Sequence, residues 1–110
     1  MDSRLLWGTV EMLILETVAD APTYGYEITQ QVFTSSEGYF ELKEGSLYPA
    51  LHRLEREKLL TSSWQEADGR RRKYYRLTPA GRKELASRKQ EWTRFAAGVN
   101  RVLGAQRVYG

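Results

Sequence analysis

Hydrophobic residues recur at helical spacing over most of this chain, in segments separated by turn-forming residues. Residues 4–19 carry apolar side chains on more than one face of a predicted helix, which predicts contact with two surfaces. The sequence Asp20-Ala21-Pro22 should end this helix. Thr23 is then expected to cap a second helix over residues 24–34. The apolar members of that helix are Tyr26, Ile28, Val32 and Phe33.

A third helix is predicted over residues 44–58. Leu47, Leu51 and Leu54 are spaced by four and three residues, so they form a stripe that should pack on the first two helices. Pro49 is expected near the first turn, where its missing N–H costs little. The side chains that fall largely away from the stripe, and are free to meet a partner, are Ser46, Pro49, His52, Arg53 and Arg56.

The pattern then changes from helix to hairpin. Strands are predicted at residues 61–66 and 70–77, joined by a turn at residues 67–69 in which Gly69 is free to take a positive φ. Thr78 and Pro79 should act as the N-cap and first residue of a last helix that runs towards residue 103. The fold class predicted is α+β, mostly α: a winged helix-turn-helix with a two-stranded wing and a long C-terminal helix.

The last helix carries a second apolar stripe. Leu85, Trp92 and Val99 are spaced by seven residues, and Phe95 lies on the same side, as in a coiled-coil seam. A lone helix with such a seam is marginal in water, so we expect a homodimer that pairs through it; in the alternative, the seam folds back onto its own domain. The domains predicted are a DNA-binding winged helix at residues 1–78, whose first helix also joins the dimer interface, and a dimerisation helix at residues 79–110.

Charge is distributed unevenly along the chain. Residues 1–42 carry one cation and seven acids, whereas residues 43–110 carry sixteen cations and seven acids, within a net charge of +3. Four consecutive cations, Arg70, Arg71, Arg72 and Lys73, follow the predicted hairpin turn. A basic segment of this kind usually meets a polyanion. Beside a helix narrow enough for a DNA groove, it predicts that at least two of these cations contact phosphate or the minor groove.

Composition argues against several other classes of protein. The chain of 110 residues has no cysteine and one histidine, so we expect neither disulfides nor a zinc site. We expect no cofactor and no enzymatic activity, since nothing resembles a catalytic constellation or a phosphate-binding glycine loop. No apolar run reaches the roughly 18 residues of a membrane span, and Glu11 and Glu16 interrupt the N-terminal apolar segment. A cytoplasmic protein without a membrane partner is expected.

Three segments resemble the PadR family of bacterial transcriptional regulators: YGYEITQQV (24–32), GSLYPALHRLEREKLL (45–60) and GRRRKYYRLTPAGRKEL (69–85). The short length and single C-terminal helix are similar to the compact branch of the family, which includes small multidrug-responsive repressors. The resemblance implies a dimer that binds a palindromic operator, often beside its own gene, and represses it until a small molecule binds. One departure is Lys58, where the family commonly has glycine; a left-handed lysine there would cost on the order of 1 kcal/mol.

The resemblance also assigns candidate DNA contacts. Ser46, Tyr48, Pro49, His52 and Arg53 match recognition-helix positions, and the fork of Arg53 suits guanine. Tyr24 and Tyr26 are expected to donate hydroxyls to phosphates beside a helix N-terminus; for these two and Tyr48, a place in the core is the alternative. The full set expected to contact DNA is Tyr24, Tyr26, Lys43, Ser46, Tyr48, Pro49, His52, Arg53, Arg70, Arg71, Arg72 and Lys73.

An effector is also implied by the resemblance. Trp92 matches a position at which compact relatives stack a tryptophan on flat hydrophobic ligands between subunits, so a small planar aromatic ligand is expected. The alternative is that Trp7 and Trp92 fill the dimer core. The residues expected at the effector site or dimer interface are Trp7, Leu85, Trp92, Phe95 and Val99.

Two other functions remain open from the sequence. One is a winged-helix protein-interaction module, with its basic wing on an acidic protein and no specific operator. The other is a nonspecific binder of nucleic acid or of an anionic membrane surface.

Overall fold

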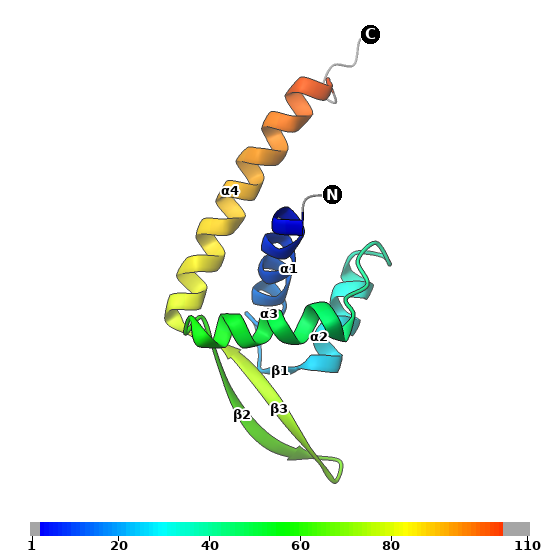
Figure 1. Cartoon of the computed structure of the whole chain (residues 1–110), viewed down its shortest axis with the longest axis vertical. Coiled ribbons are helices and arrows are strands. Elements are labelled where there is room, and N and C mark those ends of the chain that lie inside the picture. Colours follow the sequence, from blue (N-terminus) through cyan, green and yellow to red (C-terminus); the bar gives the residue numbers. More distant parts are fainter. Residues whose placement is uncertain (1–2, 105–110) are drawn as a thin grey trace.

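The computed structural model describes the backbone of residues 3–104 and the side chains of residues 8–104. Figure 1 shows the elements in chain order: helices α1 (Ser3–Thr17), α2 (Gly25–Ser35), α3 (Glu44–Arg56) and α4 (Pro79–Leu103), with strands β1 (Thr23–Tyr24), β2 (Leu60–Ala67) and β3 (Arg70–Leu77). The strands form an antiparallel sheet in the order β1-β3-β2. The predicted mostly helical α+β class, with a wing and a long last helix, is confirmed.

The core lies where α1, α2 and α3 meet. The predicted leucine stripe of α3 is confirmed, since Leu47, Leu51 and Leu54 are almost fully buried. Ile14 and Leu15 of α1 and Ile28 of α2 are buried against them in the same cluster. Because α3 is held from behind by these contacts, its opposite face remains open to a partner.

The start of α2 differs from the prediction. Thr23 is not the N-cap: it is extended, pairs with Tyr75 of β3, and donates its hydroxyl to the Ala21 carbonyl at 2.8 Å. Tyr24 is the N-cap, and its side chain makes no capping hydrogen bond within the described part of the chain. The wing predicted with two strands therefore belongs to a three-stranded sheet, which attaches the start of α2 to β3.

Two details of α3 also differ from the prediction. Because α3 begins at Glu44, Pro49 lies in its second turn rather than its first, where it has no N–H to donate to the Gly45 carbonyl. The helix ends at Arg56, and Lys58 follows in the left-handed region with φ of 64°. The amides of Lys58 and Leu59 donate back to the carbonyls of Glu55 and Leu54, at 3.0 and 2.9 Å. This is a Schellman motif with a lysine in the glycine position.

The hairpin and the start of α4 follow the prediction. Ala67 pairs with Arg70, so Asp68 and Gly69 form a two-residue turn, both at positive φ as in type I′. Thr78 caps α4 by accepting the Gly81 amide at 2.9 Å, and Pro79 is the first helical residue. Both boundaries were predictable because residues within a few positions of each one, a two-residue turn and an N-cap, mark it in the sequence.

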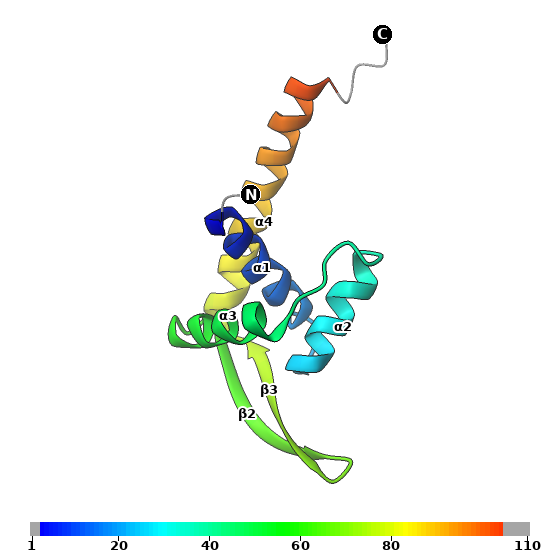
Figure 2. The same cartoon turned by 45° about the vertical axis from the view of Figure 1, so that its right-hand side comes forward.

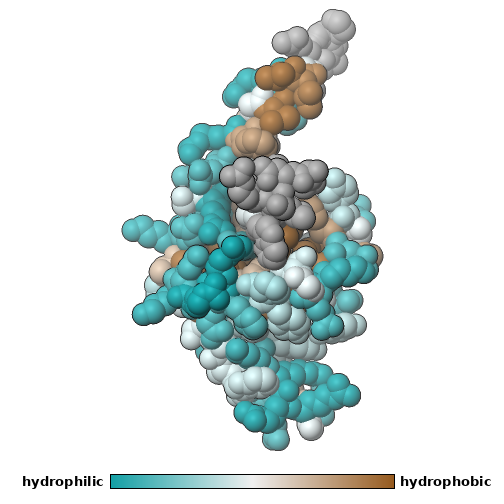
Figure 3. Space-filling view, viewed as in Figure 1, coloured by the Kyte–Doolittle hydropathy of each residue, from teal (hydrophilic) through white to brown (hydrophobic). Residues whose placement is uncertain are grey.

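The apolar stripe of α4 divides into a buried part and an exposed part. Leu85 was predicted at the dimer or effector site, but it is 7% exposed and belongs to the core, because the first turns of α4 pack on the body of the domain. Further along, Trp92, Phe95 and Val99 are 46%, 53% and 40% exposed. This part of α4 projects beyond the other elements (Figures 1 and 2), and hydrophobic residues gather near its end (Figure 3). Among the described residues, no helix is both long and apolar enough to cross a membrane.

Candidate nucleic-acid interface

A groove of about 430 Å³ lies between α3, the start of α2 and the wing. It brings together residues from all three elements, and most of them are among the predicted DNA contacts. Its lining is Tyr24, Gly25, Tyr26, Tyr48, His52, Trp64, Arg71, Arg72, Lys73 and Tyr75. Of the other predicted contacts, Pro49 and Arg70 are exposed outside the groove, and Ser46 is half-buried near the start of α3.

The floor of the groove is formed where α2 meets α3. Tyr48 is 38% exposed and His52 is exposed on the outer face of α3, one turn apart. A Cβ atom on Gly25, the first residue of α2, would stand 2.7 Å from the Tyr48 hydroxyl. The missing side chain at Gly25 therefore lets the Tyr48 ring reach the N-terminus of α2, where free amides favour an anion.

The wing cations are held in different ways. The Arg71 guanidinium lies 5.1 Å from the centre of the Trp64 ring, and that of Arg72 lies 4.5 Å from the centre of the Tyr24 ring. Tyr24 in turn meets Tyr74 edge-on, with ring centroids 5.4 Å apart. A guanidinium stacked on a ring keeps its N–H edge free for acceptors. Both arginines are therefore ordered by aromatic rings without losing the groups that bind phosphate.

Lys73 instead connects the wing to α3. Its ammonium lies 3.6 Å from one carboxylate oxygen of Glu55, and the Ser62 hydroxyl donates to the other at 2.5 Å. Glu55 thus holds both strands of the wing against α3. The pKa of Tyr75, at the base of β3, is raised to about 12 by burial and then by the negative charge of Glu55 and by Tyr48.

Arg53 does not point into the groove. Its Nε donates to Glu11 Oε2 at 2.5 Å, and its Nη2 is ion-paired with the same oxygen. Glu11 lies in α1 and its side chain is only 7% exposed. The structure therefore places the guanidinium predicted for guanine against the body of the domain, an arrangement that sequence spacing does not reveal.

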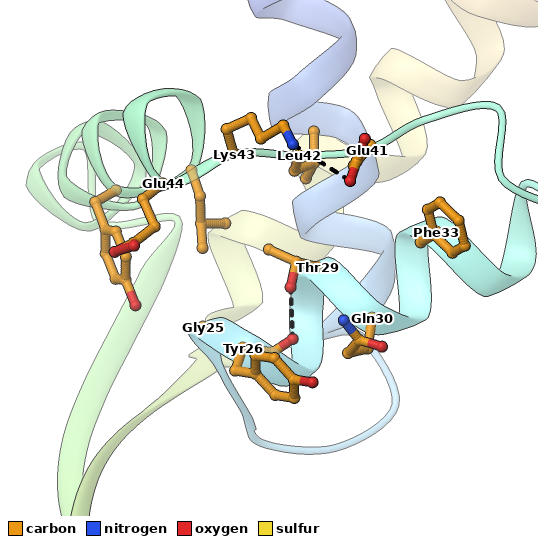
Figure 4. Close-up of a pocket in the computed structure, with 11 residues that line it drawn as sticks. Gly25, Tyr26, Thr29, Gln30, Phe33, Glu41, Leu42, Lys43 and Glu44 are labelled. Carbon is orange, nitrogen blue, oxygen red and sulfur yellow. Dashed lines mark hydrogen bonds and ion pairs between the residues drawn. The ribbon is translucent and has the colours of Figure 1, made fainter.

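A second hollow, of about 750 Å³, adjoins the groove between α2 and the start of α3. Figure 4 shows Tyr26, Gln30 and Phe33 of α2 on one side of it and residues 41–44 on the other. Lys43, a predicted contact, is paired there with Glu41 at 3.3 Å, and both side chains are largely exposed. Such a pair contributes little, so Lys43 remains available to a phosphate.

Trp64 was missed by the sequence reasoning. It is 57% exposed, lies on β2 opposite Lys73, and forms the platform for Arg71. The signal was present: an aromatic residue on one strand of a hairpin whose other strand carries consecutive cations. Tyr75 and Gly25 also line the groove, but only the tertiary structure brings them there.

A separate cavity of about 450 Å³ lies between α1 and α4. Trp92 and Phe95, two of the predicted effector or dimer residues, line it and stack with ring centroids 5.7 Å apart. Glu11, Arg88 and Glu91 supply its charged wall. The Trp7 side chain, also predicted there, lies outside the described residues.

These features define a class: a winged helix-turn-helix with a recognition helix, a basic wing, and a groove suited to nucleic acid. Residues 14–87 match the family described as "Transcriptional regulator PadR-like family". The chain belongs to this family of transcriptional regulators, which bind DNA and are not enzymes.

Individual relatives agree with the family assignment. The chain is 41% identical over 99 residues to Transcriptional regulator Rv3488 of Mycobacterium tuberculosis, covering 90% of this chain and 87% of that protein. A transcriptional regulator from Clostridium thermocellum has a similar structure, with a TM-score of 0.82 and 32% identity over 89% of this chain and 96% of that one. A PadR family regulator from Clostridium difficile gives a TM-score of 0.76 and 38% identity over 86% and 97%. The family, the winged fold and the class of function predicted from the sequence are thereby confirmed.

Proposed function

We propose that this protein is a dimeric repressor that binds one palindromic operator, at its own or a neighbouring operon, and is released by a small planar aromatic effector. Two copies of α3 enter successive major grooves, and the wings contact the flanking backbone. The observation that carries this proposal is the groove in which Tyr48 and His52 of α3 lie beside Arg71 and Arg72 of the wing.

The dimer is supported by the outer half of α4. Trp92, Phe95 and Val99 are joined on the same helix by Val102 and Leu103, which are 84% and 74% exposed. A projecting helix with this many exposed apolar residues is unfavourable in water, and a second copy of the helix would cover them. We therefore assign dimerisation to the part of α4 that follows Arg88.

The effector is supported by the cavity between α1 and α4. Its walls combine the Trp92 and Phe95 rings with two carboxylates, Glu11 and Glu91, and one cation, Arg88. Stacking on indole suits a flat aromatic molecule, and the exposed carboxylate of Glu91 favours a cationic one. Such a ligand releases DNA only if it binds better to a dimer whose recognition helices no longer match the operator.

The test is operator selection from a random duplex pool, followed by affinity measurements over a range of salt. We expect one palindrome to be selected, with an affinity that falls steeply as salt rises. The double variant Arg71→Ala/Arg72→Ala removes four cations from the dimer, two from each wing, so it should weaken binding at least about tenfold and reduce the salt slope by about three to four. The variant Arg94→Ala/Arg101→Ala removes the same charge from beside the apolar stripe of α4, away from the wing (Figure 1), and should bind like the parent; sedimentation of this variant distinguishes loss of the dimer from loss of a DNA contact.

Equal affinity for the selected and scrambled duplexes would overturn the proposal. If the wing variant also kept its DNA affinity but lost a protein partner, the protein-interaction module would be the better assignment.

A further inference from the structure

Glu11 is a buried carboxylate that is shared by three helices. It lies on α1, and its two oxygens are used by different neighbours: Oε2 by Arg53 of α3 and Oε1 by Arg88 of α4, whose Nη1 donates at 2.9 Å. A buried carboxylate is unfavourable unless cations pair with it, so the loss of either guanidinium leaves Glu11 less well compensated. Glu11 therefore connects the recognition helix to the helix assigned to the dimer.

A second connection joins the same two helices where α3 ends and α4 begins. The Thr78 hydroxyl donates to the Lys58 carbonyl at 2.8 Å. Next to it, Gly81 lies so close to the chain that a Cβ there would stand 2.1 Å from the Leu59 carbonyl oxygen. This corner fixes the point at which the two helices meet, and the burial of Leu85 holds the first turns of α4 against the domain. The Glu11 bridge lies away from the corner on both helices, so it adds a polar restraint on the angle between them that links α3 directly to α4 through one side chain.

The Arg88 end of the bridge is itself held in place. Its Nε donates to Glu84 at 2.7 Å, one turn earlier on α4, while Nη1 reaches Glu11. Burial lowers the pKa of Arg88, but hydrogen bonds to Glu84 and Glu11 and the charges of both raise it overall. Contacts with Glu84 on α4 therefore orient the charged guanidinium of Arg88 independently of α3.

We propose that Glu11 is a positioning residue for operator recognition: by fixing the angle between α3 and α4, it sets the separation of the two recognition helices and so the spacing of half-sites that the dimer accepts. This inference rests on the proposed dimeric repressor. In that dimer, α4 defines the interface and α3 reads the groove, so any rotation of α3 relative to α4 displaces the two reading surfaces from each other.

The dependence of binding on half-site spacing shows whether Glu11 positions the recognition helices or only stabilises the fold. Each base pair added between half-sites moves one of them by about 3.4 Å and rotates it by about 35°. A rigid dimer accepts one half-site spacing. A dimer in which the angle between α3 and α4 can vary also accepts spacings that are one or two base pairs longer or shorter. Loss of stability alone lowers the fraction of folded protein and weakens binding to every spacing by the same factor.

Three substitutions cut the bridge at different points. In Glu11→Gln, the amide keeps one acceptor oxygen and presents an NH₂ group to the other guanidinium, so it can serve only one helix. Arg53→Met removes the arm to α3, and Arg88→Met removes the arm to α4. The matched control is Glu16→Gln, because Glu16 also joins α1 to α4, through a pair with Lys89 at 2.9 Å, but the side chains of this pair are each 56% exposed whereas Glu11 is buried.

The experiment measures affinity for duplexes that keep both selected half-sites but have a spacer lengthened or shortened by one or two base pairs. We expect the parent and Glu16→Gln to prefer one spacing by about tenfold, and the three bridge variants to prefer it by about twofold. Circular dichroism and thermal unfolding give the folded fraction. If Glu11→Gln fails to fold, the inference is tested with Arg53→Met and Arg88→Met. Each of these variants leaves Glu11 paired with one guanidinium.

Two results would overturn the inference while leaving the proposed function intact. One is an equal loss of affinity at all spacings with the parental preference unchanged. The other is a change of base preference at one half-site position in Arg53→Met with spacing preference unchanged, which would make Arg53 a reader of sequence. If the parent itself selects no operator, the proposed function has failed rather than the role of Glu11.

Discussion

Gly25 and Tyr48 meet in the groove between α2, α3 and the wing, where the first residue of α2 lies against the tyrosine ring of α3. A Cβ atom on Gly25 would stand 2.7 Å from the Tyr48 hydroxyl oxygen and 3.2 Å from Cζ. Both distances are shorter than a normal contact of a side-chain carbon. The absence of a side chain at Gly25 thus determines where the Tyr48 hydroxyl lies relative to the N-terminus of α2.

Gly25→Ala should therefore weaken operator binding more than it weakens the fold. Tyr48 is 38% exposed, so its ring can swing outwards to admit the methyl group. We expect a loss of affinity of about tenfold, with the free energy of unfolding lowered by about 1 kcal/mol or less. The measurements are operator titration and urea unfolding of the same preparations.

A double-mutant cycle with Tyr48→Phe tests the cause of that loss. If displacement of the Tyr48 hydroxyl weakens binding, Gly25→Ala should cost much less in the Tyr48→Phe background than in the parent. Fully additive losses would show that Gly25 acts in some other way.

A side chain at Gly81 would clash more severely than one at Gly25, because the atom that it would meet belongs to the backbone and cannot rotate away. A Cβ on Gly81 would stand 2.1 Å from the backbone oxygen of Leu59. We expect Gly81→Ala to destabilise the fold by about 3 kcal/mol or more. Gly45→Ala is the control, because its Cβ would meet no atom of the described residues within 4 Å; it should raise stability by about 0.5 kcal/mol. Thermal unfolding of both variants checks the prediction, and equal midpoints would contradict it.

Lys58→Gly should stabilise the protein. Lys58 occupies the left-handed position of the Schellman motif with φ of 64°, where a Cβ is unfavourable. Replacement by glycine should raise the free energy of unfolding by about 1 kcal/mol. Its neighbour Glu57 has φ of −81°, so Glu57→Gly should instead lower it. Urea unfolding distinguishes the two, and destabilisation by Lys58→Gly would show that the lysine side chain makes a contribution that outweighs its strain.

The outer half of α4 gives a prediction about assembly. Phe95 is 53% exposed beside Trp92, and in the proposed dimer a carboxylate in its place would be buried against a second copy. We expect Phe95→Glu to raise the dimer dissociation constant at least about a hundredfold. Gln90→Glu makes the same change of charge on another face of α4 and should leave the dimer dissociation constant nearly unchanged. Sedimentation over a concentration series measures both, and a monomeric parent at micromolar concentration would contradict the proposed dimer.

Elements with a local signal were predictable from the sequence. The spacing of Leu47, Leu51 and Leu54 decides which face of α3 is buried, whatever packs on it. Thr78 and Pro79 mark the start of α4 through bonds within its own first turn, and Gly69 completes a hairpin turn with the residue beside it. In each case the chemistry lies within a few residues, so no tertiary contact was needed.

The remaining differences between the predictions and the structure arise from distant partners. Thr23 has the composition of a cap, but pairing with Tyr75 draws it into a sheet. Arg53 has the right place on α3 for DNA, but Glu11, far away in sequence, holds its guanidinium. Leu85 has the same seven-residue spacing from Trp92 whether it meets its own core or a second helix. Spacing gives the face on which a side chain lies, whereas only packing determines which partner reaches it.

Tyr75 gives a prediction about alkaline pH. Its pKa is raised to about 12, first by burial and then by the charge of Glu55 and by Tyr48, from about 10 in an unfolded chain. The folded state thus holds this proton more tightly than the unfolded state. The resulting stability is fully present below pH 10 and is lost as pH rises towards 12, by about 2–3 kcal/mol. Because other tyrosines and lysines titrate in the same window, the useful quantity is the difference between the parent and Tyr75→Phe. The parent should lose more stability than the variant between pH 10 and 12, as measured by urea unfolding; parallel curves would show that the Tyr75 hydroxyl is not buried as described.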